Sequence, residues 1–138
     1  MFPSVVEKKQ AEYSLRQAAR AVAFTQEKKI VLMFVSKHNY HKLPGGRLDE
    51  NEDWLQALDR EMAEETGYKI KVIGEIGKII EYRDKIVEKQ ESRCYLAKTI
   101  GEKIDAQLED GEKDAGLQMQ LASLEQAIKL VENDSPDK

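Results

Sequence analysis

Three glutamates at helical spacing are the residues of this sequence best suited to do chemistry. Glu61, Glu64 and Glu65 stand at positions i, i+3 and i+4, so a helix would bring their carboxylates together. At about 100° per residue, Glu65 falls inside the apolar stripe of that helix and Glu61 lies on its edge. Like charges at this spacing destabilise a helix by about 0.2–0.5 kcal/mol per pair. Such a group of carboxylates therefore needs a neutralising partner.

Two kinds of partner could neutralise these carboxylates. Arg60 stands beside them and could pair with one, but it cannot serve all three. A hard divalent cation, Mg²⁺ or Mn²⁺, prefers carboxylate oxygens and would turn the mutual repulsion into coordination. The alternative is a solvated acidic face, because glutamates are mostly exposed to water. The spacing alone leaves both interpretations open.

The helix that carries the glutamates has marked ends. Asp53 and Gln56 have the spacing of a capping box, and Gly67 stands where a C-terminal glycine cap would end the helix. A helix is therefore predicted over 54–66. The KLPGGR segment that precedes it predicts a loop, since proline and glycine interrupt regular structure.

Strands are predicted on both sides of this helix. Six consecutive apolar residues, Ile30 to Val35, predict a strand buried on both faces, joined to residues 15–24 in a hairpin by the short polar TQEKK segment. Residues 69–83 predict one or two strands, with a bulge or bend at their two glycines. Shorter strands are predicted over 92–100 and 116–121.

The C-terminal part is predicted to be a long loop followed by a helix. Residues 101–117 are polar and contain glycine, which favours a loop. Ser123 and Gln126 repeat the capping-box spacing before an amphipathic stretch, which predicts a helix. We expect a single domain over 1–133 and a frayed tail over 134–138, since no repeat or linker divides the chain.

Composition limits the function classes that fit the chain. With 138 residues, 41% apolar and 35% charged, the sequence suits one small soluble domain with one core. A net charge of −4 provides no basic field for a polyanion, so broad nucleic-acid binding is disfavoured. A small phosphate-bearing substrate stays compatible with this charge, because a bound cation reverses the sign of the local field.

Cysteine usage and hydropathy favour a cytoplasmic location. Cys94 is the only cysteine, so the chain can form no intramolecular disulfide and no cysteine-based zinc site. We recognise no signal-peptide core at the start of the sequence. No stretch approaches the roughly 18 apolar residues that a membrane-spanning helix needs, so no membrane association is expected.

The stretch GRLDENEDWLQALDREMAEETGY, residues 46–68, resembles the signature of the Nudix hydrolase family. Every fixed position of that signature is filled, and only Tyr68 is unusual, since the family more often has an aliphatic residue there. The LPGG segment, the preceding hairpin and the terminal SLEQAIKLV stretch are also similar to small members of the family. The resemblance implies an α/β (α+β) fold, a Nudix-like α/β/α sandwich with a mixed β-sheet.

The resemblance also implies a reaction, a cofactor and a substrate class. Family members hydrolyse the pyrophosphate of a nucleoside diphosphate linked to another group, with Mg²⁺ or Mn²⁺ as cofactor and a small-molecule nucleotide as partner. A nucleoside triphosphate, oxidised or otherwise non-standard forms included, is the default for so compact a chain. The alternative is a catalytically silent, nucleotide-sensing member. Homodimerisation is left open.

Family roles transfer to the matching positions. The expected metal ligands are Glu61, Glu64, Glu65 and the carbonyl of Gly45. Arg60 would orient the glutamates, and Glu64 is favoured as the general base. The residues expected to shape the motif are Glu52, which fixes the loop against the helix, and Gly67.

Further residues are expected to complete the site. Gly46 lets the backbone approach the metal and phosphate, and Arg47 is placed to meet a phosphate. Lys42 is a weaker candidate for the same role. Many family members use a later glutamate as well, and between Glu109 and Glu112 the spacing from the following glycine favours Glu112. A plain solvated loop is the alternative there.

Overall fold

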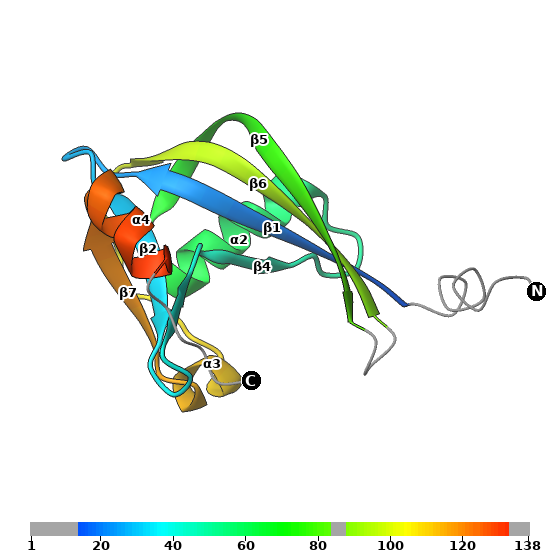
Figure 1. The fold of residues 1–138 in the computed structure, drawn as a ribbon. Helices are drawn as coiled ribbons and strands as arrows, with labels where there is room; N and C mark the ends of the chain where they lie inside the picture. The colour runs from blue at the N-terminus through cyan, green and yellow to red at the C-terminus, as the bar shows by residue number, and fades with distance from the viewer. Residues whose placement is uncertain (1–13, 84–87, 133–138) are drawn as a thin grey trace, which may run out of the picture.

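A computed structural model describes residues 14–83 and 88–132 of the chain (Figure 1). The predicted tail at 134–138 lies outside the described residues. The elements in order are β1 (Ser14–Phe24), β2 (Ile30–Val35), β3 (Tyr40–Lys42), β4 (Gly45–Arg47), α2 (Trp54–Thr66), β5 (Lys69–Arg83), β6 (Glu88–Ile100), α3 (Asp110–Asp114), β7 (Leu117–Ala122) and α4 (Leu124–Glu132).

The strands form one mixed sheet that branches at β1. The strand order is β3-β2-β1-β6-β5, with β4 paired to β1 and β7 paired to β2. β1 runs parallel to β6 along its whole length, whereas all other pairs are antiparallel. β1 pairs with β2 only next to the hairpin, where Phe24 lies opposite Ile30. Farther from the hairpin, β4 pairs with β1 instead. In Figure 1, β2 and β7 consequently run away from the long β1, β5 and β6 layer.

α2 and α4 cover opposite faces of the sheet. β2 packs against both helices because its successive side chains point to opposite faces. Val31 packs with Leu58 and Met62 of α2, whereas Ile30 and Leu32 pack on the side of α4. All six residues of β2 except Phe34 are buried, as predicted for a strand covered on both faces. Burial of a side chain such as Leu58 stabilises the fold by about 1.5–3 kcal/mol. The expected α/β/α sandwich with a mixed sheet is confirmed.

The ends of α2 are those that the sequence predicts. The Asp53 carboxylate accepts a hydrogen bond from the backbone N–H of Gln56 at 2.8 Å. The Gln56 side chain in turn accepts one from the backbone N–H of Asp53 at 3.0 Å. Gly67 adopts a left-handed conformation, with φ of 77°, and its N–H donates to the carbonyl of Ala63. The helix therefore begins and ends at capped residues.

Residues 69–83 form one continuous strand rather than two. Its pairing with β6 shifts register between Val72 and Gly74 and again between Glu75 and Gly77, so both predicted glycine positions carry a bulge. β6 begins at Glu88, earlier than the predicted start at residue 92. Its polar first residues gave no apolar signal, yet they pair with β1 on one side and β5 on the other.

The prediction of a loop over 101–117 is wrong in its second half. Residues 110–114 form α3, and β7 begins at Leu117. The Glu112 carboxylate accepts a hydrogen bond from the backbone N–H of Glu109 at 3.0 Å, which stabilises the first turn. A helix of five residues has no apolar periodicity to reveal it, and all five residues of α3 are polar or glycine.

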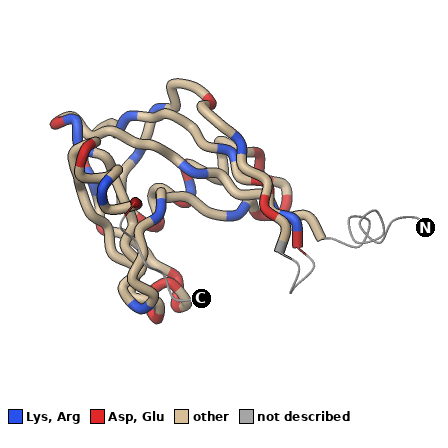
Figure 2. The backbone as a smooth tube through the Cα atoms, viewed as in Figure 1, with Lys and Arg blue, Asp and Glu red and all other residues tan. Residues whose placement is uncertain are grey.

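Charged residues of both signs are distributed over the whole described fold (Figure 2). Acidic residues gather around the loop that precedes α2 and around α3. Over the same residues, no helix is both long and apolar enough to cross a bilayer.

Candidate active site

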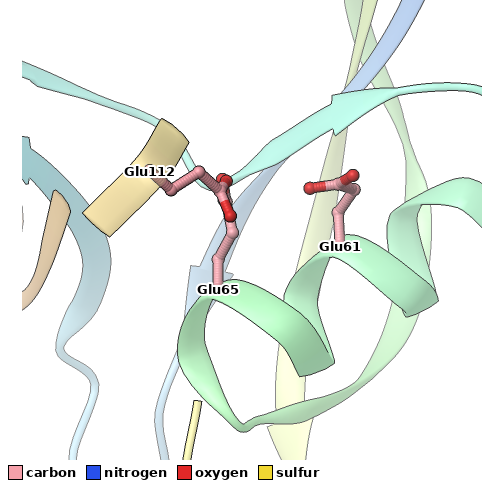
Figure 3. Close-up of side chains that lie close together, drawn as sticks. All are labelled: Glu61, Glu65 and Glu112. Atoms are coloured by element: carbon pink, nitrogen blue, oxygen red, sulfur yellow. The ribbon is translucent and has the colours of Figure 1, made fainter. Parts of the chain in front are cut away.

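Three carboxylates from two helices meet in front of β4. Glu61 and Glu65 extend from α2, and Glu112 extends toward them from α3 (Figure 3). One carboxylate oxygen of each lies within 4.8 Å of the others. The side chain of Glu61 is 12% exposed and the residue Glu65 is 2% exposed, so the group does not form a solvated face.

The segment before α3 carries Glu112 to this group by closing over the C-terminal end of α2. The N–H of Ile104 donates to the carbonyl of Gly67 at 2.9 Å, and that of Gln107 donates to the carbonyl of Glu64 at 2.7 Å. Both carbonyls belong to the helix end, where intrahelical partners run out. On the far side of α3, the N–H of Lys37 donates to the carbonyl of Ala115 at 3.1 Å. Glu112 is therefore held from both ends of its helix.

Gly45 and Gly46 bring the backbone of β4 up to the carboxylates. The N–H of Gly45 donates to Glu65 Oε1 at 2.9 Å. Gly45 has φ of 136°, and a Cβ there would collide with the carbonyl of Ala19 on β1. A Cβ on Gly46 would lie only 2.6 Å from Cδ of Glu61. The first glycine is thus needed by the backbone, and the second leaves room for a carboxylate of the site.

The carboxylates of this group are costly to ionise. Burial, the Glu112 carboxyl to which it is hydrogen-bonded, and the negative charge of Glu112 raise the pKa of Glu65 to about 8. Burial also raises the pKa of Glu61, although Arg60 opposes this change. Buried, mutually repelling oxygen donors match the ligand preference of a hard divalent cation, and a cation among them would remove the repulsion. The residues therefore fit Mg²⁺ or Mn²⁺.

Arg60 organises the remaining acidic residues of the motif. Its Nε and Nη2 donate to the two oxygens of Glu52 at 2.7 and 2.9 Å. Its Nη1 donates to Glu61 at 2.7 Å and to Glu64 at 3.3 Å. Its Nη2 also donates to the carbonyl of Arg47 at 3.0 Å, which attaches β4 to α2. This geometry is the one expected of an arginine that orients the glutamates.

Glu52 fastens the loop between β4 and α2. Besides the bidentate pair with Arg60, its Oε1 accepts a hydrogen bond from the backbone N–H of Asp49 at 2.7 Å. The hydrogen bond from Arg60 holds the pKa of Glu52 below its ordinary value. Glu52 thus holds the loop at one end of the motif, and Gly67 ends α2 at the other.

Glu64 and Arg47 lie apart from the three converging carboxylates. The Glu64 side chain is 29% exposed and is held by Arg60, and it does not belong to the group formed by Glu61, Glu65 and Glu112. The Arg47 guanidinium donates to the buried carboxylate of Glu88 at 3.2 Å. A pocket on that side of β4 is lined by Arg16, Arg47 and the loop up to Glu52.

Two cations lie near the site, of which Lys42 is the weaker phosphate candidate named from the sequence and Arg20 was missed there. Arg20 of β1 donates through Nη1 to the carbonyl of Gly45 at 2.9 Å, so the carbonyl expected to bind metal already accepts a hydrogen bond. Lys42 of β3 is half-buried, and burial, with the charge of Arg20 next, lowers its pKa against the attraction of Glu65 and Glu112. An arginine inside the otherwise apolar run from Ala18 to Phe24 was the available signal for Arg20.

Many solved structures share this fold, and several of them are described as NUDIX hydrolases. A NUDIX hydrolase from Nitrosomonas europaea is 18% identical, with 85% of this chain and 78% of that chain covered and a TM-score of 0.66. The E. coli ORF135 protein is 16% identical, with coverages of 88% and 82% and a TM-score of 0.67. A MutT NUDIX hydrolase from Burkholderia pseudomallei is 18% identical, with coverages of 91% and 89% and a TM-score of 0.64. At these identities the likeness establishes the fold.

The family follows from the sequence match. A search of curated proteins finds no match. The family model described as NUDIX domain matches residues 14–138, which is nearly the whole chain. That range includes the glutamates of α2, the Arg60 network and Glu112. The chain therefore belongs to the Nudix family of hydrolases, which act on nucleoside diphosphate derivatives.

Proposed function

We propose that the protein is a metal-dependent hydrolase that cleaves the pyrophosphate of a nucleotide. The observation that carries this proposal is the convergence of Glu61, Glu65 and Glu112 from two helices that are far apart in the sequence. A structural role would not require Glu65 to meet the Glu112 carboxylate with Glu61 beside them, because bringing buried like charges together opposes folding.

The three converging residues, Glu61, Glu65 and Glu112, would hold Mg²⁺ or Mn²⁺, with Gly45 supplying its carbonyl beside them. When bound, the cation supplies charge neutralisation of phosphate oxygens and a lowered pKa for a water ligand. Gly46 supports this role, since its missing side chain leaves the space that the Glu61 carboxylate occupies. Glu64, expected from the sequence as a further ligand, would lie at the edge of this group.

Glu64 is our candidate for the general base. Water attacks one phosphorus of the pyrophosphate, the bond from that phosphorus to the bridging oxygen breaks, and the proton of the water passes to the Glu64 carboxylate. The position of Glu64 supports this role, because its carboxylate is partly exposed beside the metal-binding group rather than inside it. Arg60 holds both Glu61 and Glu64 and would keep the base oriented.

We propose a nucleoside triphosphate, oxidised or otherwise non-standard forms included, as the substrate. No additional motif for coenzyme A or NADH is present in the sequence, which favours a compact nucleotide. Arg47 remains a predicted phosphate ligand, and substrate binding there would require its guanidinium to leave Glu88. A cytoplasmic location and homodimerisation also stay predictions.

Phosphate and pyrophosphate release from a nucleotide panel with Mg²⁺ tests the proposal. The panel holds canonical and oxidised triphosphates, ADP-ribose, dinucleoside polyphosphates and sugar nucleotides. We expect metal-dependent turnover of a triphosphate that is lost in Glu64→Gln and in Glu65→Gln, with Glu125→Gln on the exposed side of α4 as the matched control. A folded wild-type protein that binds nucleotide yet turns over no member of the panel would instead support the silent, sensing role.

A further inference from the structure

Arg20 and Lys42 are two cations that lie beside the carboxylate group. Lys42 interacts electrostatically with Arg20 and with Glu65 and Glu112 of the site. Among the described residues, Arg20 donates only through Nη1, to the carbonyls of Leu43 and Gly45 at 3.4 and 2.9 Å. Within 14–83 and 88–132, neither Arg20 nor Lys42 has a carboxylate at ion-pair distance.

Other cations of the fold form ion pairs with carboxylates. Arg16 and Arg47 both reach Glu88, at 3.3 and 3.2 Å, and Lys78 reaches Glu91 at 3.3 Å. Those three side chains are about half exposed, so water also stabilises their charges. The Lys42 ammonium group is half-buried beside a guanidinium, and burial and the charge of Arg20 disfavour its ionised form despite the attraction of Glu65 and Glu112. An anionic ligand would remove this cost.

The surroundings of Lys42 leave room for such an anion. Lys42 lines a pocket of about 170 Å³ together with Tyr40 and Glu112, so the pocket adjoins the carboxylate group itself. Arg20 contacts the backbone of Gly45, whose N–H in turn donates to Glu65. A ligand in this position would touch cations of the protein at one end and face the metal-binding oxygens at the other.

We propose that Lys42 and Arg20 bind the phosphoryl oxygens of the substrate that the cation on Glu61, Glu65 and Glu112 does not hold. This inference rests on the proposed function and adds the groups that position the polyphosphate. The ligand class that this arrangement defines is a chain of at least two phosphoryl groups, one held by the cation and the next by Lys42 and Arg20. Lys42 contributes a point charge, and Arg20 contributes its free N–H groups.

Binding of inorganic pyrophosphate with Mg²⁺, measured by calorimetry, tests this inference without turnover. We expect Lys42→Met to weaken binding by about 10- to 100-fold, the loss typical of a charge-assisted hydrogen bond. Lys42→Arg should retain most of the affinity. Lys71→Met, which removes an exposed lysine of β5, should bind as the wild type does.

Thermal unfolding of the ligand-free variants separates binding from a structural role. We expect Lys42→Met not to lower the melting temperature, since it removes a half-buried charge that forms no ion pair with the residues the structure describes. Arg20→Met gives a second variant, with weaker pyrophosphate binding expected together with some loss of stability. Equal pyrophosphate affinity in wild type and Lys42→Met would overturn the inference, and so would an equal loss in Lys71→Met or the absence of binding by the wild type.

The two proposals fail in different ways. If the wild-type protein hydrolyses a nucleotide and Lys42→Met leaves its KM and kcat unchanged, the inference about Lys42 is wrong and the enzyme assignment stands. If pyrophosphate binding depends on Lys42 while no nucleotide is hydrolysed, the positioning role stands and the enzyme assignment is wrong.

Discussion

The carboxylates around α2 fall into two groups that the protein treats in opposite ways. Glu52 is neutralised by Arg60 through a bidentate pair, and its pKa is held low. Glu65 meets another carboxylate instead, and its pKa is raised to about 8. Both lie within the same motif, so composition does not distinguish them. The group that the protein neutralises itself holds the loop, and the group left with excess charge is the one suited to bind a cation.

The largest expected effect comes from removing a charge in the metal-binding group. Glu65→Gln should lower kcat/KM by about 10³-fold, because metal-assisted catalysis supplies several kcal/mol. The metal-free protein should not lose stability at pH 8, since glutamine removes a buried like charge. Steady-state kinetics and thermal unfolding without metal measure the two quantities.

The next effect concerns the neutralised group. Arg60→Met leaves Glu52 and Glu61 without their donor, and we expect the free energy of unfolding to fall by about 1–3 kcal/mol. Urea unfolding measures this change, with Lys71→Met as the control for loss of an exposed cation. A change below about 0.5 kcal/mol, typical of an ordinary surface position, would mean that Arg60 does not stabilise the loop.

The two glycines of β4 also have different roles, since Gly46 makes room for a carboxylate of the site and Gly45 is needed for folding. Gly46→Ala places a methyl group against the Glu61 carboxylate, so Mg²⁺ affinity should fall by about 10- to 100-fold with little change in stability. Gly45→Ala should instead impair folding, because its φ is positive and its Cβ meets backbone. Calorimetric Mg²⁺ titration and circular dichroism distinguish the two outcomes, and equal defects in both variants would contradict this division.

Stability should depend on pH in opposite directions for the two groups. The pKa of Glu65 is about 8 when folded and about 4.3 when unfolded, so the native state binds more protons between these values. The contribution of Glu65 is thus present below about pH 4 and is lost as pH rises through 8. Glu52, with its lowered pKa, contributes stability above about pH 4 that is lost on acidification.

Thermal unfolding from pH 5 to pH 9 measures the contribution of Glu65. Stabilisation by added Mg²⁺ should grow with pH over this range, because the ligands must lose their protons. Glu65→Gln is the control, since it should remove both dependences. If the stabilisation of the wild-type protein by Mg²⁺ did not change from pH 5 to pH 9, the pKa of Glu65 would not be raised by burial and by its neighbours.

The smallest effect is expected at the start of α2, outside both groups. Asp53→Ala removes the side-chain cap and should lower the free energy of unfolding by about 1 kcal/mol. Turnover at a temperature where the variant is folded should equal that of the wild type. A large loss of activity would show that the helix start is coupled to the site and that the two groups are not independent.

The local structure of the motif was predictable from the sequence. The limits of α2, its capping box and its glycine cap depend on neighbouring residues, and all three agree with prediction. The bulges of β5 and the buried strand β2 were predictable for the same reason, because each follows from side-chain type and spacing. The family match also follows from the motif itself.

The tertiary structure decided which acidic residues share a site. Spacing placed Glu61, Glu64 and Glu65 together, but helical spacing alone could not show that Glu64 would lie outside the group formed by Glu61, Glu65 and Glu112. Glu112 joins Glu61 and Glu65 because the segment before α3 bonds to the carbonyl ends of α2. No local pattern encodes that closure, since it depends on contacts between segments that are distant in the chain. Arg20 and Lys42 approach the site for the same reason, through strands that meet only in the folded sheet.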